Sequence, residues 1–144
     1  MTDSAEWPSY SDNPSDDAES SDAHMIERDG IEYAGCHLIL DIWQAKNLEN
    51  IEEIEDCFRR CVIAAEATLL HIHLHHFTEG GGVSGVAVLA ESHISIHTWP
   101  EKNYAAFDIF MCGNAKPEKT IPIILETFQC KRHKVTEILR GKMD

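Results

Sequence analysis

Basic residues are scarce in this sequence. Twelve lysines and arginines stand against 25 aspartates and glutamates, and the formal net charge is -13. Nucleic-acid binding needs a basic surface that displaces counterions from phosphates, so no nucleic-acid partner is expected. No apolar run reaches the roughly 20 residues of a transmembrane helix, and the first residues lack the basic and apolar segments of a signal peptide. We therefore expect no membrane partner either.

Cysteine pairs that would form a disulfide framework are also missing. The chain has five cysteines, an odd number, and no Cys-x-x-Cys pair. This pattern favours reduced thiols in a cytoplasmic protein. No nucleotide-cofactor motif is present, so any chemistry that needs an electron sink must find it elsewhere.

The acidic charge is concentrated at one end of the chain. Residues 1–33 contain ten acids and one base, whereas the rest contains 15 acids and 11 bases. The segment is also rich in serine and buries too few apolar side chains to offset the entropy of ordering. We predict a disordered acidic tail over residues 1–33 and one folded domain over 34–144, a length that suits a single core.

Hydrophobic periodicity predicts six strands and two helices in this domain. The helices are expected at 48–67, with Asn47 or Asn50 as the cap, and at 117–132, where Pro122 must lie in the first turn or kink the helix. The strands are expected at 36–43, 68–77, 83–90, 93–99, 103–112 and 134–140. This order predicts an α+β two-layer sandwich, with both helices packed on one face of a mostly antiparallel sheet.

Alternating histidines distinguish the second predicted strand, whose sequence HIHLHH puts His71, His73 and His75 on one face. Imidazoles bind metals, and a non-catalytic, His-rich metal-binding module is therefore one alternative for the function. Residues two apart on a strand lie about 7 Å from one another, which makes convergence on one ion awkward. We favour a polar sheet face and assign no metal ligand.

The most informative segment is GVSGVAVLAESHISIHTWPEKNYAAFDIFMCG, residues 82–113. An apolar strand runs directly into Glu91 and Ser92, and two histidines follow within five residues. This segment resembles the small prokaryotic S-adenosylmethionine decarboxylase proenzymes, which depend on a pyruvoyl group. Weaker similarity extends over residues 34–141.

The resemblance implies a zymogen that cleaves its own backbone between Glu91 and Ser92. The Ser92 hydroxyl would attack the Glu91 carbonyl, and elimination and hydrolysis would convert Ser92 to a pyruvoyl cofactor. That ketone would bind the amine of S-adenosylmethionine as a Schiff base and accept the electrons released with CO₂. The product would serve spermidine biosynthesis. A same-scaffold arginine or ornithine decarboxylase is the alternative within this chemistry.

The resemblance also assigns roles to individual residues. His97 is the base that removes the α-proton during maturation, and Cys112 is the acid that reprotonates the substrate carbon. Ser84 supports processing, Glu101 accepts hydrogen bonds from the ribose hydroxyls, and Phe77 stacks on adenine.

A distance argument predicts a homodimer. Five extended residues separate Ser92 from His97 by roughly 16 Å, so one chain cannot bring the two together. A two-fold dimer with shared sites removes this difficulty. The resemblance implies the same arrangement, in which Ser92 and Cys112 of one protomer meet Phe77, Ser84, His97 and Glu101 of the other. It leaves higher assembly open.

Overall fold

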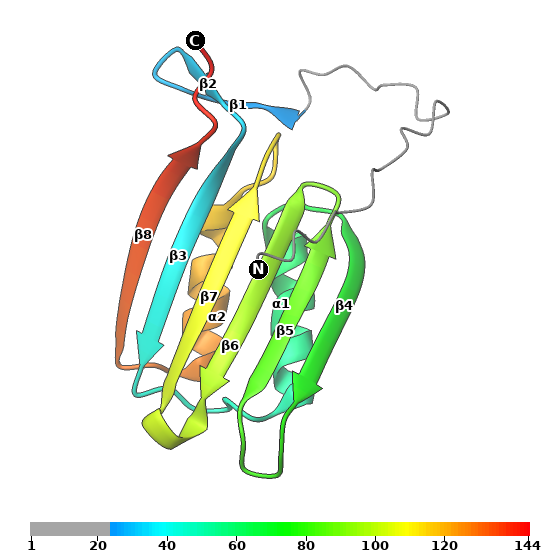
Figure 1. The fold of residues 1–144 in the computed structure, drawn as a ribbon, viewed down its shortest axis with the longest axis vertical. Coiled ribbons are helices and arrows are strands. Elements are labelled where there is room, and N and C mark those ends of the chain that lie inside the picture. Colours follow the sequence, from blue (N-terminus) through cyan, green and yellow to red (C-terminus); the bar gives the residue numbers. More distant parts are fainter. Residues whose placement is uncertain (1–23) are drawn as a thin grey trace, which may run out of the picture.

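One six-stranded antiparallel sheet organises the computed structural model, which describes residues 24–144 (Figure 1). The strand order is β4-β5-β6-β7-β3-β8. The strands are β3 (Gly35–Trp43), β4 (Leu69–His76), β5 (Val83–Leu89), β6 (Ser92–Trp99), β7 (Tyr104–Met111) and β8 (Arg132–Arg140). Every neighbouring pair is antiparallel.

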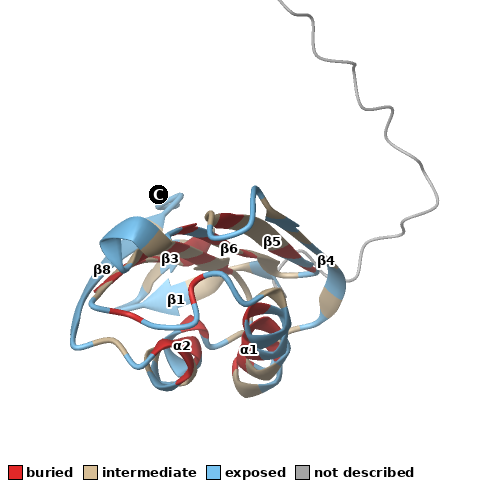
Figure 2. Cartoon of the chain, turned by 90° about the horizontal axis from the view of Figure 1, so that it is seen from below, coloured by how far each residue is buried: buried red, intermediate tan, exposed pale blue. Residues whose placement is uncertain are grey.

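Both helices lie on the same face of this sheet (Figure 2), which confirms the predicted two-layer α+β sandwich. Helix α1 (Ile51–Ala64) begins after Asn50, whose side chain accepts a hydrogen bond from the backbone of Glu53. Helix α2 (Thr120–Phe128) follows a 3₁₀ turn, η3 (Pro117–Lys119), and is shorter than predicted. Pro122 lies in its first turn, as expected. Within residues 24–144, neither helix is both long and apolar enough to cross a bilayer.

Strand alternation divides the side chains between a core and an uncovered face. On β6, Ile94 and Ile96 are fully buried, because they point toward the helices. Phe58 of α1 and Phe128 of α2 are buried against the same side of the sheet. We call the side without helices the open face. It carries partly exposed apolar residues, including Val88 on β5 and Ile138 on β8, which are 39% and 42% exposed.

The predicted acidic tail does not extend to residue 33. The structure places β1 (Ile26–Arg28) and β2 (Ile31–Tyr33) in a two-stranded hairpin, so the prediction of disorder is wrong for this part. The hairpin contacts the C-terminal strand, because Arg28 forms an ion pair with Glu137 at 3.2 Å. Residues 1–23, the rest of the predicted tail, lie outside the described residues.

The hydroxyl of Thr98 joins three segments at one end of the sheet. This side chain is only 6% exposed. It donates a hydrogen bond to the Leu48 carbonyl at 2.7 Å and accepts one from the Val83 backbone amide at 2.8 Å. The loop before α1 is thereby tied to the beginning of β5 and the end of β6.

Replacing this hydroxyl by a methyl group tests its contribution. Thr98→Val keeps the shape but leaves the Val83 amide and the Leu48 carbonyl without their partner. We expect a loss of about 1–3 kcal/mol in the free energy of unfolding, measured by urea denaturation. Thr98→Ser retains the hydroxyl and is expected to lose clearly less. A Thr98→Val variant as stable as the wild type would show that these hydrogen bonds contribute nothing to stability.

Candidate active site

The predicted site residues form two groups at opposite ends of the sheet. Ser92 is the first residue of β6 and pairs with Met111, which directly precedes Cys112. At the other end of the same strand, His97 pairs with Ser84 on β5. The chain thus brings Ser92 close to Cys112 and His97 close to Ser84, but it holds the two pairs apart.

The first group, which we call the cleavage cluster, consists of Glu91, Ser92 and Cys112. The Glu91 carbonyl oxygen accepts two hydrogen bonds from Cys112, one from the backbone amide at 3.1 Å and one from the thiol at 2.9 Å. Ser92 has a φ of 152°, a value that residues with a side chain seldom adopt. Two donors therefore polarise the carbonyl that immediately precedes a strained serine.

A further pair of contacts fixes the turn that carries Glu91. Both oxygens of the Glu91 carboxylate accept from the Thr68 backbone amide, at 3.0 and 3.1 Å. The Ala90 amide donates to the Thr68 carbonyl at 3.0 Å. The turn between β5 and β6 is thus attached to the start of β4 through both main chain and side chain.

The surroundings of Cys112 keep its sulfur in the thiol form. Burial raises the pKa of Cys112 above its ordinary value, and the neighbouring Glu91 carboxylate raises it further. Both effects disfavour the charged thiolate. The side chain is consequently a proton donor at neutral pH, consistent with its hydrogen bond to the Glu91 carbonyl.

His93 is a member of this region that the sequence analysis did not single out. Its Nδ1 atom lies 3.3 Å from the Ser92 hydroxyl. Adjacent residues of a regular strand point to opposite faces, so this contact depends on the unusual φ of Ser92. Burial lowers the pKa of His93, and the nearby His37 lowers it further, which favours the neutral imidazole. In the sequence, the only indication of this contact was that His93 directly follows Ser92.

The second group lines a cavity of about 300 Å³, which we call the histidine pocket. Its lining includes all four residues of the second predicted set, which are Phe77, Ser84, His97 and Glu101. Within it, the Ser84 hydroxyl and His97 Nδ1 are 2.8 Å apart.

Two aromatic side chains border the histidine pocket. Phe77 is 61% exposed and Trp99 is 41% exposed, so both present ring surface to solvent. Trp99 was also missed in the sequence, although strand alternation places it on the same face as His97. The pocket thus combines aromatic surface, an imidazole and the Glu101 carboxylate.

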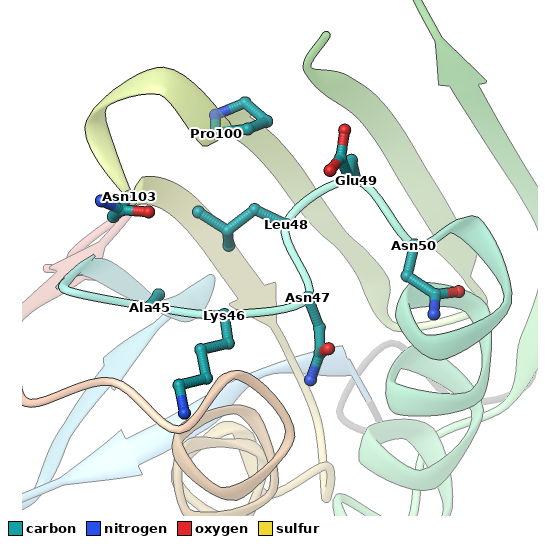
Figure 3. Close-up of a pocket in the computed structure, with 8 residues that line it drawn as sticks. All are labelled: Ala45, Lys46, Asn47, Leu48, Glu49, Asn50, Pro100 and Asn103. Atoms are coloured by element: carbon teal, nitrogen blue, oxygen red, sulfur yellow. The ribbon is translucent and has the colours of Figure 1, made fainter. Parts of the chain in front are cut away.

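Another cavity at this end of the molecule contains none of the predicted site residues. It measures about 420 Å³ and is lined by residues 45–50 together with Pro100 and Asn103 (Figure 3). Asn47 and Asn50 are already engaged, because Asn47 donates to the Thr127 carbonyl and Asn50 caps α1. We assign no chemistry to this cavity.

The alternating histidines of β4 lie along the edge of the sheet, opposite Val88, Val86 and Ser84 of β5. Over residues 24–144, the structure has no cluster of three or more histidine, cysteine, aspartate or glutamate side chains that could hold a metal ion. The metal-binding alternative gains no support from this geometry.

Comparisons with known proteins identify the family. The family model described as S-adenosylmethionine decarboxylase matches residues 36–141. The S-adenosylmethionine decarboxylase proenzyme of Thermomicrobium roseum is 42% identical over 108 residues, which cover 74% of this chain and 93% of that protein. The proenzyme of Methanococcus maripaludis is 46% identical over 113 residues, covering 76% and 92%.

A solved structure agrees with the sequence comparisons. The crystal structure of the adenosylmethionine decarboxylase from Aquifex aeolicus superposes with a TM-score of 0.70 at 31% identity, over 76% of this chain and 92% of that one. The residues matched by the family model, 36–141, include the strands that carry both groups of site residues. On this combined sequence and structural similarity, the chain belongs to the S-adenosylmethionine decarboxylase family.

Proposed function

We propose that this protein is a self-processing, pyruvoyl-dependent decarboxylase that acts on S-adenosylmethionine and supplies its product to spermidine biosynthesis. The observation that carries the proposal is the cleavage cluster, in which Cys112 donates two hydrogen bonds to the carbonyl of the residue before Ser92. Membership of the family supports the substrate. The five free cysteines favour a cytoplasmic location.

The cluster has the parts that cleavage between Glu91 and Ser92 requires. Backbone strain at Ser92 makes the preceding peptide bond easier to distort. The amide and thiol of Cys112 are aimed at the oxygen on which negative charge develops during attack, as in an oxyanion hole. The Ser92 hydroxyl is the nucleophile, and the residue it leaves behind becomes the pyruvoyl group.

When formed, the pyruvoyl group supplies a carbonyl that binds the substrate amine and accepts the electrons released with CO₂. This chain then provides the remaining functions. Cys112, held as a thiol by burial and by Glu91, has a proton to deliver beside Ser92. We assign to His97 the removal of the Ser92 α-proton during maturation, and Ser84 orients its imidazole at 2.8 Å.

The histidine pocket suits a nucleoside. The Glu101 carboxylate offers two acceptor oxygens to a pair of ribose hydroxyls, and the exposed rings of Phe77 and Trp99 provide apolar surface for a planar base. Arginine and ornithine have neither a ribose nor a purine and leave both features unused. An assay with all three amino acids decides the substrate, and preference for arginine or ornithine would overturn this part of the proposal.

The open face supports a dimer in which each subunit completes the other's site. The cleavage cluster and the histidine pocket lie at opposite ends of β6 within one chain. In the proposed dimer, the open faces of two sheets pack against each other. A two-fold axis that lies between the sheets and perpendicular to their strands brings the cleavage cluster of one protomer to the histidine pocket of its partner. Exposed apolar residues of the open face, such as Val88 and Trp99, would be buried in that contact.

Self-cleavage is tested by intact-mass spectrometry of the purified full-length protein. We expect two chains, residues 1–91 and 92–144, with a pyruvoyl group in place of Ser92 that reacts with hydrazines. Ser92→Ala removes the nucleophile and is expected to leave one uncut chain. A wild-type chain that folds but stays intact indefinitely would falsify the proposed function.

Shared sites are tested by complementation between two inactive variants. Cys112→Ala disables the cleavage cluster, and Glu101→Ala disables the histidine pocket. In a mixed dimer one site carries both defects and the other carries none, so about half of the wild-type activity per mixed dimer is expected. Both variants are purified after cleavage and then mixed under conditions that exchange subunits. Activity no higher than that of the parents, in mixed dimers verified by mass, contradicts sharing.

A further inference from the structure

The contact between His93 and Ser92 is not used by the mechanism described so far. Self-cleavage begins when the Ser92 hydroxyl loses a proton, and a base must accept that proton. His97 lies at the far end of β6 in the same chain, whereas His93 Nδ1 is 3.3 Å from the Ser92 oxygen. The structure therefore offers a base within the same protomer.

We propose that His93 is the general base for the first step of self-cleavage, and that this step takes place within a single protomer before the partner's His97 acts. The inference rests on the proposed self-processing and adds a catalytic residue to it. It also divides maturation into a step inside one chain and a later step between chains.

The first step is an isomerisation that needs no co-reactant. With its proton on Nε2, His93 accepts the Ser92 hydroxyl proton on Nδ1 while the serine oxygen bonds to the Glu91 carbonyl carbon. The oxyanion is held by the amide and thiol of Cys112. Collapse breaks the bond between the Glu91 carbon and the Ser92 nitrogen, which takes the proton from His93. The product is an ester in place of the amide.

All the groups for this step come from one chain. The nucleophile and base are consecutive residues of β6, and the oxyanion donors come from Cys112, which follows β7. The contacts that attach the turn to Thr68 also lie within the same protomer. By contrast, no atom of the histidine pocket is needed until the α-proton is removed.

Packing around His93 favours a neutral base. Phe110 of β7 lies beside the imidazole, with ring centroids 6.1 Å apart. Burial is the main cause of its lowered pKa, followed by His37 on β3; Arg140 on β8 also lowers it, and Asp108 on β7 opposes these effects. The Asp108 carboxylate is engaged by His37 Nε2 at 2.9 Å, which leaves it less able to stabilise a protonated His93.

The ester between Glu91 and Ser92 can be detected directly, because hydroxylamine cleaves an ester under conditions that leave an amide intact. The full-length His97→Asn chain lacks the later base and is expected to accumulate ester. Adding His93→Asn to that chain should slow ester formation roughly hundredfold, in the range that general bases contribute. The time course is followed from the start of refolding, with hydroxylamine cleavage between residues 91 and 92 detected by mass.

The matched control is His133→Ala in the same His97→Asn chain, since His133 is an exposed residue of β8. It should form ester at the unaltered rate. Equal ester formation with and without His93 overturns the inference but leaves the proposed function standing, provided that the wild type is cleaved. Failure of the wild-type chain to cleave removes the proposed function itself.

Two further measurements keep the inference testable if the double variant does not fold. In the His97→Asn chain, ester formation should be first order and independent of protein concentration. Its rate should decrease in acidic solution as the imidazole is protonated, and because the pKa of His93 is lowered, this decrease should occur at a lower pH than for an ordinary histidine. A rate that rises with protein concentration, or one that acid does not lower, contradicts the inference.

Discussion

The length and stiffness of strand β6 are the constraint on which the organisation of the site depends. Hydrogen-bonded on both sides by β5 and β7, the strand cannot fold back, so Ser92 and His97 stay roughly 16 Å apart. In the proposed dimer, each end of β6 supplies only part of a reactive centre. The sheet would then act as a rigid spacer between the two parts, and a second copy of the same chain would complete each site.

Local strain at Ser92 is sustained by contacts that do not involve Ser92 itself. A residue held in a sparsely populated backbone region costs on the order of 1–3 kcal/mol, and such a conformation persists only where its surroundings enforce it. Here the Glu91 carbonyl is held by Cys112, the Glu91 carboxylate by Thr68, and Leu89 is buried in the core just before the turn. Of these contacts, the two hydrogen bonds from Cys112 also polarise the Glu91 carbonyl.

Residue patterns predicted the layers and the two separated groups, because alternation on β6 and its five-residue spacing are local properties. The hairpin at Ile26–Tyr33 was missed because its strands are only three residues long and lie in a polar, acidic context. The closeness of Ser92 and Cys112 follows from the register of two strands, which no local pattern encodes; the family resemblance supplied it. The contact between His93 and Ser92 depends on one backbone angle and could not be foreseen.

The bond between Glu91 and Ser92 lies at the tip of the hairpin that β5 and β6 form. Cleavage at this position breaks none of the backbone pairing between β5 and β6, because the paired residues of β5, from Ser84 to Leu89, all precede the cleaved bond. Two separate polypeptides would then share one continuous sheet, with new ends side by side at its rim. The interleaved strands would hold the two fragments together, and their dissociation would require unfolding of the whole domain.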